Sequence, residues 1–463
     1  MDLYQKFKAD SGISNEEIIK NLINSHMISE SKQDNYNGMM YYRSKNTAIN
    51  SRSDTNYVKN NKVANGFFKK LVDQKVNYLV GKDVTIDNNV ITNILSPNDF
   101  LKELSRDASK TGIGWLHLYV DSRGNLSYRL VDNIEIIPIW DTEFEEELQQ
   151  IIRYYQVEVV SDKGLVYRNK VEVWDTEKVT YYIEDEDGNY YFDTLLVANP
   201  VWHFNTSYKV LGRESKVERF GWGAVPFIPL FNNEDYLSDL DIIKNQIDLY
   251  DIVESDFANN LEHFQDSIIV LKDKSYQDYE QFMDILKKYK ILPVDETGDA
   301  SYLKLDIPVE ARKELLAMLR DNIYEFGQGV DSRAVGDGNI TNIVIQARYS
   351  DLDLKCDDFK RQVLKFLYKL FDYIESFRMK TSWKPNMMLK IKRPNITFNK
   401  SMIFNMSETI ENCVKSLGIV SRKTLTSNHP WVDDVNKELE EIDKDEVILN
   451  DPDGTEGEGI NTI

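Results

Sequence analysis

The sequence predicts an α+β protein built from more than one structural region. Short, regularly spaced strand patterns occupy residues 113–235, and long helical patterns replace them after the proline-containing segment VPFIPLFNNED. The chain has 463 residues, of which 41% are hydrophobic. This length exceeds the size at which one hydrophobic core keeps growing, so two or more regions are expected.

The N-terminal part combines a polar arm with one clear helix. Residues 1–55 are polar, with a weak helical pattern over Glu16–Ile28 and a Ser- and Asn-rich stretch after it. This arm is expected either to embrace a neighbouring subunit or to be a partly disordered terminus. Apolar residues then recur at helical spacing from Tyr57 to Leu79, and Gly81 ends that helix before the strand-like DVTI.

The strand-rich region begins after a second short helix near Asp99–Ser109. Strand patterns follow at WLHLYV, SYRL and IEIIPIW, with a turn at residues 122–125 between the first two. Others occur at IRYYQVEVV, KVEVW, KVTYYIE and YYFDTLL, and DEDGN joins the last pair. The short, regular spacing predicts an antiparallel meander.

Three long helical patterns follow this region. The first carries an apolar stripe from Leu240 to Phe264, with acidic residues on the opposite face: Asp239, Asp241, Asp248, Asp251, Glu254 and Asp256. A small insert then has strand patterns and a short helix over Tyr279–Tyr289. The second long helix ends at Phe326, and the third runs from about Asn342 to Phe377.

A glycine-rich loop, GQGVDSRAVGDGNIT, joins the second and third of these helices. Its glycines permit backbone angles that other residues avoid, so the loop can change shape between two rigid helices: Gly327, Gly329, Gly336 and Gly338. Such a loop suits a moving contact that grips or gates. A plain helix–helix linker with a glycine cap is the alternative.

Composition limits the classes of partner and compartment. Lys and Arg total 56 against 77 for Asp and Glu, which gives a net charge of −21. Tight general binding to nucleic-acid backbone is disfavoured, although repulsion would suit a protein past which DNA slides; an ordinary acidic protein is the other interpretation. Cys356 and Cys413 form neither a disulfide framework nor a zinc cluster. We expect a soluble protein without an export signal or a membrane span.

Motifs for bond chemistry are absent from the sequence. It contains no GxxxxGK[ST] phosphate loop, no HExxH and no GxSxG, and its five histidines are scattered singly. Acidic pairs such as Asp185-Glu186 and Asp357-Asp358 more often form turns and solvated faces than metal sites. We therefore expect no catalytic residues, no metal, no cofactor and no enzymatic activity.

Two segments resemble bacteriophage portal proteins, specifically the Gp6-like family of tailed phages that infect low-GC Gram-positive bacteria. They are NGFFKKLVDQKVNYLVGKDVTI at 65–86 and AVPFIPLFNNEDYLSDLDIIKNQIDLYDIVESDFANNLEHFQDSIIVLKD at 224–273. The similarity extends over most of residues 45–400. The proline-containing apolar segment, the Asn-Asn pair, the long acidic helix and the DSIIVL strand occur in the family's order.

The resemblance implies a ring-forming portal fold, with a β-rich wing, long stem helices, a small α/β clip and a helical crown. Its parts would be an N-terminal arm at 1–55, the wing at 56–235 and 342–400, stem helices at 236–265 and 309–327, the clip at 266–308, the tunnel loop at 328–341, and the crown with an acidic tail at 401–463. The carboxylate-rich segment from Asp433 to Glu458 is expected to be solvated. Stem charges are expected to face the channel or solvent.

The resemblance also implies a function and its partners. Portal subunits form a homo-oligomeric ring, usually a dodecamer, at one capsid vertex of the virion, after assembly in the host bacterial cytoplasm. The terminase large subunit pumps double-stranded DNA through the ring, and head-tail adaptor proteins later connect it to the tail. Capsid and scaffolding proteins are further expected partners, and no membrane is involved.

Candidate site residues follow from these roles. In the tunnel loop, polar or basic side chains are expected to approach the DNA backbone, with the four glycines as hinges: Gln328, Arg333, Asn339 and Thr341. In the clip, Lys287, Lys288 and Lys290 are candidates for docking terminase or adaptor, with solvated lysines as the alternative. Two other functions stay open: a different phage structural component such as a head-tail adaptor, and a metal-dependent hydrolase.

Overall fold

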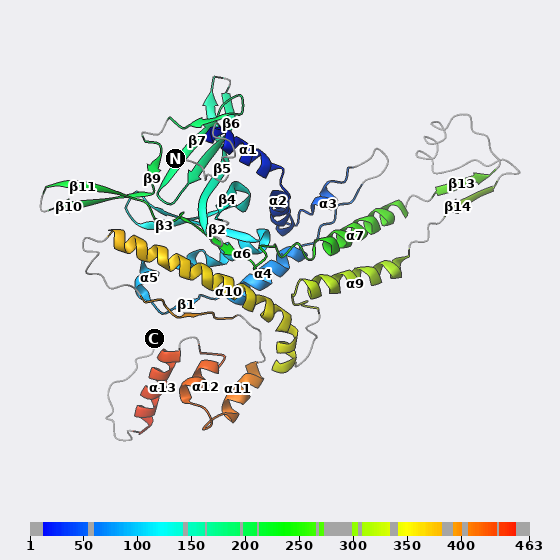
Figure 1. Cartoon of the computed structure of the whole chain (residues 1–463). Coiled ribbons are helices and arrows are strands. Elements are labelled where there is room, and N and C mark those ends of the chain that lie inside the picture. Colours follow the sequence, from blue (N-terminus) through cyan, green and yellow to red (C-terminus); the bar gives the residue numbers. More distant parts are fainter. Residues whose placement is uncertain are drawn as a thin grey trace, which may run out of the picture. The chain divides into compact units, whose positions relative to one another are not determined.

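A computed structural model of the chain describes residues 13–53, 60–141, 147–162, 164–194, 198–210, 213–264, 268–272, 299–303, 308–333, 341–381, 392–400, 406–432 and 435–450. The chain divides into two compact units. The first comprises residues 1–329 and 355–400, and the second comprises residues 330–354 and 401–463. The first unit contains the sheets and most of the helices (Figure 1).

The N-terminal arm is helical within its described residues, and it packs on its own chain. Serine caps begin the first two helices, since Ser14 accepts from the Glu17 N–H and Ser29 from the Lys32 N–H. The helices are α1 (Asn15–Met27), α2 (Glu30–Tyr42) and α3 (Thr47–Asn50). The buried isoleucines of α1 lie against sheet residues such as Tyr182. The alternative of a disordered terminus is wrong for residues 13–53, whereas contact of this arm with a neighbouring subunit stays a prediction.

The next helices include α6, which packs on strands β2 and β12, and they differ from the prediction in one boundary. They are α4 (Phe67–Val80), α5 (Asn89–Ile94), the 3-10 helix η2 (Pro97–Asp99) and α6 (Leu101–Thr111), with the short strand β1 (Thr85–Ile86) after α4. The predicted helix from Tyr57 is wrong at its start, because residues 60–66 are not helical. The N–H groups of Asn61 and Val63 donate to the side chains of Asn259 and Ser255 instead, at 2.7 and 3.0 Å.

The strand-rich region forms two main sheets. One is three-stranded, in the order β12-β2-β3, and the other is six-stranded, in the order β4-β5-β6-β7-β8 with β9 on β7. The strands are β2 (Ile113–Val120), β3 (Leu126–Val131), β4 (Ile136–Trp140), β5 (Leu148–Ser161), β6 (Gly164–Trp174), β7 (Lys178–Glu184), β8 (Tyr190–Phe192), β9 (Val201–Trp202) and β12 (Phe227–Phe231), with the 3-10 helix η3 (Asn133–Glu135) before β4. The predicted meander is confirmed for β4 to β8.

The prediction of one continuous meander is wrong for the three-stranded sheet. Strand β12 returns from far along the sequence to pair with β2, with Phe227 opposite His117. Its apolar run has Phe227, Ile228 and Leu230 fully buried, as expected for a strand covered on both faces. Trp115 and Trp174 join Phe227 in a core built from residues of both sheets.

A two-stranded hairpin in this unit was not predicted. Strands β10 (Phe204–Val210) and β11 (Arg213–Phe220) pair with each other and with no other described strand. Figure 1 shows them projecting beyond the sheets. Phe204 and Phe220 stack at the base, with ring centroids 5.6 Å apart. The polar sequence of this segment lacks the apolar alternation by which the other strands were recognised.

Two of the long helices lie side by side in the first unit (Figure 1). They are α7 (Lys244–Phe264) and α9 (Val309–Phe326), and the insert between them contains the paired strands β13 (Ile268–Lys272) and β14 (Asp299–Leu303). The first helix begins later than its apolar stripe predicts. Side chains of the preceding turn bond to the backbone instead, as when Asn233 accepts from the Leu237 N–H at 2.9 Å and Ser238 from the Leu240 N–H at 3.0 Å.

The third long helix and the C-terminal helices complete the chain. The predicted long helix is confirmed as α10 (Asn342–Thr381), and β15 (Ile396–Thr397) pairs with β1. Three helices follow in the second unit: α11 (Met406–Lys415), α12 (Arg422–Asn428) and α13 (Val435–Asn450). Residues 435–450 of the acidic tail are helical, and no side chain described between 435 and 444 is buried. Ile442 of α13 lines a cavity with Leu425 of α12, and Arg422 pairs with Asp443 at 3.3 Å.

Candidate functional site

The glycine-rich loop is described at residues 328–333 and at Thr341. Gln328 has a φ of 53°, in the left-handed region, and its N–H donates to the Glu325 carbonyl at 3.0 Å. The Gly329 N–H donates to the Tyr324 carbonyl at 2.9 Å, so α9 ends in a left-handed cap. Gln328, Arg333 and Thr341 are exposed. Gly336, Gly338 and Asn339 lie outside the described residues.

The two described glycines of the loop have a packing reason to be glycine. A Cβ on Gly329 would stand 2.1 Å from Leu71 Cδ2, and one on Gly327 would stand 2.8 Å from Leu71 Cδ1 and 2.6 Å from the Ile323 carbonyl oxygen. Both distances to Leu71 are far shorter than van der Waals contact. The backbone therefore passes so close to α4 that a side chain is excluded there. Their role as hinges stays a prediction.

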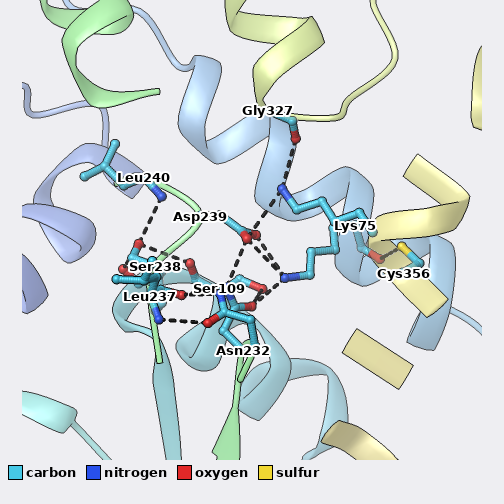
Figure 2. Close-up of polar contacts among 12 residues, drawn as sticks. Lys75, Ser109, Asn232, Leu237, Ser238, Asp239, Leu240, Gly327 and Cys356 are labelled. Carbon is cyan, nitrogen blue, oxygen red and sulfur yellow. Dashed lines mark hydrogen bonds and ion pairs between the residues drawn. The ribbon is translucent and has the colours of Figure 1, made fainter. Parts of the chain in front are cut away.

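The start of the loop is held by a buried polar cluster, here called the lysine–aspartate cluster: Lys75, Asn232, Asp239 and Lys355. Figure 2 labels the first three of these together with Gly327. The Lys355 ammonium on α10 donates to the Gly327 carbonyl at 2.9 Å and lies 3.4 Å from Asp239 Oδ1. The Lys75 ammonium on α4 lies 3.0 Å from Asp239 Oδ2. Side-chain exposure is only 2% for Lys75 and 7% for Asp239.

Further hydrogen bonds satisfy the cluster. Asn232, just after β12, donates to Asp239 Oδ1 at 3.0 Å and accepts from the Lys75 ammonium. The Asp239 N–H donates to the Ser109 carbonyl at 3.0 Å. The Lys75 ammonium also lies 4.3 Å from the centroid of the Phe359 ring. The cluster thus ties α4, α6, β12 and α10 to the end of α9.

The charges in the cluster stabilise one another. Burial by itself would raise the pKa of Asp239, but the ammonium groups of Lys355 and Lys75 and the bond from Asn232 outweigh burial and lower the pKa to about 2. Asp239 is therefore ionised, and it counteracts the cost of burying the Lys75 ammonium. Burial raises the pKa of the neighbouring Cys356 thiol to about 12, so this cysteine is an unreactive packing residue.

The sequence interpretation missed this cluster. One signal was present, because Lys75 falls between Val72 and Val76 on the apolar stripe of its helix, where a solvated lysine is not expected. Asn232 was noted only as part of the Asn-Asn pair. Asp239 was assigned to the acidic face of the next helix, and no pattern in the sequence connects it with Lys355.

The acidic face of α7 contacts its own chain. Asp251 is fully buried and accepts hydrogen bonds from the side chains of Asn46 and Asn65, both at 2.8 Å. Arg52 pairs with Asp256 at 2.7 Å. Burial raises the pKa of Asp251, although these amide donors oppose the shift. The expectation that this face points to a channel or to solvent is wrong for Asp239 and Asp251.

The other candidate residues are distributed as follows. Lys287, Lys288 and Lys290 lie outside the described residues. His117 and His203 are packed among aromatic rings, and burial lowers their pKa values to about 3 and about 4. Among the described residues, no group of three His, Cys, Asp or Glu side chains is arranged to hold a metal ion. No helix of the described chain is both long and apolar enough to cross a membrane.

Comparison with known proteins identifies the family. The model of a family described as phage portal protein, SPP1 Gp6-like, matches residues 23–447. The chain belongs to this family. It is 31% identical to the portal protein of Clostridium phage phiCD119 over 430 residues, which cover 86% of this chain and 89% of that protein. It is 30% identical to the portal protein of Bacillus phage SPP1 over 404 residues, covering 83% of this chain and 76% of that protein.

Family membership establishes a phage portal function, and portal proteins are structural components of the virion rather than enzymes. The portal function stands in place of the two alternatives that the sequence left open, a head-tail adaptor and a metal-dependent hydrolase. Among solved structures, a chain titled as the neck of a native GTA particle has a TM-score of 0.38 and 10% identity, over 79% of this chain and 90% of that chain. The mixed helix and sheet architecture agrees with the α+β prediction.

Proposed function

We propose that copies of this chain form a ring, with twelve as the expected number, around a channel for double-stranded DNA at one capsid vertex. Terminase would package DNA through it, and adaptors would later connect it to the tail. In this arrangement α7 and α9 are the stem helices, and the insert at 266–308 is the clip. Residues 328–341 are the tunnel loop, residues 56–235 and 342–400 are the wing, and residues 401–463 are the crown with its acidic tail. Assembly would take place in the host cytoplasm, with capsid and scaffolding proteins as partners.

Exposed apolar side chains on the stem pair support ring assembly. Leu249 of α7 is 43% exposed, and Met318 and Phe326 of α9 are 53% and 46% exposed. Apolar groups gathered on two adjacent helices are typical of a surface that another protein covers. In a ring, each subunit would cover the stem of the next through a repeated head-to-tail contact.

Electron microscopy of the purified protein tests the ring. Wild type is expected to show rings with a central channel, and Leu249→Asp with Met318→Asp should yield dissociated subunits. Val90→Asp is a matched control, because Val90 is 50% exposed but lies on α5, away from the stem pair. A compact wild-type monomer at assembly concentrations would contradict the proposal.

The loop is proposed to touch the passing DNA through Gln328, Arg333, Asn339 and Thr341, with its glycines as hinges. Exposure of Gln328, Arg333 and Thr341 supports this role. Replacing Gly336 and Gly338 with Pro should block DNA packaging while rings still form, since proline fixes one backbone angle and removes a donor. Gly457→Pro, in the C-terminal tail, is the control. Packaging at the wild-type rate with the loop prolines would exclude the gripping role.

Docking of terminase or adaptor on the clip is proposed to use Lys287, Lys288 and Lys290. Reversal of all three charges to Glu should weaken terminase binding to assembled rings, as measured by co-sedimentation. Lys423→Glu, an exposed lysine of α12, serves as the control. Unchanged terminase binding by the triple variant would leave these lysines as ordinary solvated charges.

A further inference from the structure

A surface pocket of about 310 Å³ lies where the segment after β12 faces the middle of α10, within the first unit. It is lined by Pro229, Phe231, Asn233, Glu234, Tyr236, Gln362, Lys365, Phe366 and Lys369. Its volume is at the lower end of the range for ligand sites, enough for one or two side chains of a partner. The roles proposed above for the stem, loop and clip do not use this pocket.

Gln362 is a buried polar side chain in the lining. As a whole residue it is only 5% exposed, and its side chain lines the cavity. A side-chain amide both donates and accepts hydrogen bonds. Gln362 can therefore bond to a ligand that enters the cavity.

Two lysines of α10 line the pocket. Lys365 and Lys369 lie one helical turn apart on this helix. Glu234 is the acidic residue of the lining, so the lining has a net charge of +1 (2 − 1). The charge of Glu147 also acts on Lys369, from outside the lining.

The opposite wall of the pocket is preorganised. Asn233 accepts from the N–H groups of Asp235 and Leu237, at 3.1 and 2.9 Å. Tyr236 has a φ of 60°, which is costly for an aromatic residue, and its ring centroid lies 4.5 Å from that of Phe231. Gly112 supports this turn closely, since a Cβ there would stand 2.0 Å from the Tyr236 carbonyl oxygen. The strained turn thus holds an aromatic pair at the pocket.

We propose that this pocket binds a short acidic segment of a partner protein. One carboxylate would lie between Lys365 and Lys369, an adjacent apolar side chain would pack on Phe231 and Tyr236, and the Gln362 amide would bond to the segment. The net charge of +1 matches a single carboxylate. A phosphate dianion fits less well, because the lining contains no arginine and its own carboxylate repels a second negative charge.

The test uses assembled wild-type protein and a defined probe, the peptide acetyl-Gly-Glu-Phe-Glu-Gly-amide, with binding measured by saturation-transfer NMR of the peptide. Wild type is expected to bind the peptide and to prefer it clearly over the peptide with Gln in place of Glu. Lys365→Glu with Lys369→Glu should weaken binding by about tenfold or more. Arg361→Glu is the matched control on the same helix, with a side chain that is 74% exposed.

Several outcomes would overturn the proposal. They are no peptide binding at millimolar concentration, equal binding of the Gln peptide, and equal loss with Arg361→Glu. Stronger binding of inorganic phosphate or of a short DNA duplex, abolished by the same two lysine changes, would assign the pocket to another ligand. Ring formation is measured separately by electron microscopy, so failure of this proposal is distinguishable from failure of the portal assembly.

Discussion

At the scale of single residues, the most consequential feature is an ion pair buried in a hydrophobic setting. Lys75 and Asp239 are almost inaccessible, and each has further hydrogen-bond partners in the lysine–aspartate cluster. Removing one member of such a pair leaves an uncompensated charge in a medium that solvates it poorly. The cluster is therefore sensitive to single substitutions although it has no catalytic role.

Substitution of Lys75 by Met should lower the free energy of unfolding by about 3–5 kcal/mol, because Asp239 keeps its charge and loses its closest ammonium. Chemical denaturation measures the change. Lys69→Met on the same helix is the control, because its pair with Asp73 is an exposed i,i+4 contact at 2.5 Å and such pairs contribute about 0–1 kcal/mol. Equal costs for the two substitutions would show that burial of the pair does not matter.

Asp239 should also make stability depend on pH. Its pKa is about 2 in the folded chain against an ordinary value of 3.8, so the unfolded chain binds more protons between these values. The stabilisation is complete above the unfolded pKa and is lost as pH falls toward 2. The stability difference between wild type and Asp239→Asn should shrink by about 1 kcal/mol between pH 6 and pH 3. Denaturant titrations at each pH measure it, and a constant difference contradicts the assignment.

Sequence reasoning had different success with different kinds of residue. The turn at residues 122–125 was recognised, because its residue types have local roles. Gly124 has a φ of 85°, and Asp121, just before the turn, accepts from the N–H groups of Arg123 and Asn125. The partners of Asp239 were not recognised, because Lys75 and Lys355 are far from it in sequence. A contact of that kind is set by tertiary packing, which a periodic pattern does not encode.

At the scale of elements, the end of α9 is fixed by close packing on α4. The Gly329 backbone approaches Leu71 so closely that even a methyl group is excluded. The glycine-rich composition suggests a flexible linker, but the backbone at Gly329 is closely packed against Leu71.

Gly329→Ala should lower the free energy of unfolding by about 1–3 kcal/mol, as expected for overpacking. Leu71→Ala removes the obstructing side chain and leaves space for the new methyl. The double variant should therefore lose less stability than the sum of the single variants, by about 1 kcal/mol or more, in a double-mutant cycle. Strict additivity would mean that the two residues do not meet.

The presence of the long helices was predicted more accurately than the residues at which they begin, and one pair of strands was missed. The long periodic patterns gave α9 and α10 correctly, because burial of one face imposes a repeat that the sequence shows directly. The start of α7 was placed too early, since Leu240 and Ile243 continue the apolar stripe although they lie in turns. The hairpin β10–β11 has no such stripe and was missed.

At the scale of the whole molecule, the excess of acidic residues is a property of the chain rather than of one site. The net charge is −21, and this excess remains after internal ion pairs such as those of Asp239 and Asp256 are counted, because each pair contributes zero to the sum. A protein that lets DNA pass should not hold it electrostatically. The family assignment agrees with the function inferred from the sequence, whereas the order of arm, wing, stem, clip and crown stays a proposal.

The purified protein should therefore show little binding to linear double-stranded DNA outside a packaging reaction. Counterion release by basic residues drives general DNA binding, and a chain with more acidic than basic residues gains little from it. Filter binding at about 50 to 200 mM salt measures this. Tight retention that falls steeply with salt would contradict the expectation and would indicate a concentrated basic surface.

The hydrogen bond from Lys355 to Gly327 has a consequence for how this family can vary. It brings the residue before the loop next to a residue well inside α10, so the chain leaves and re-enters the first unit at nearly the same point. The residues between Gly327 and Lys355 therefore form a segment whose two ends are joined by this hydrogen bond. Insertions or deletions in this segment change its length but not the contact between its ends. The entropic cost of bringing those ends together rises only slowly with the length of the segment. The segment proposed to face the DNA can therefore change in length while the packed residues at its two ends keep their geometry.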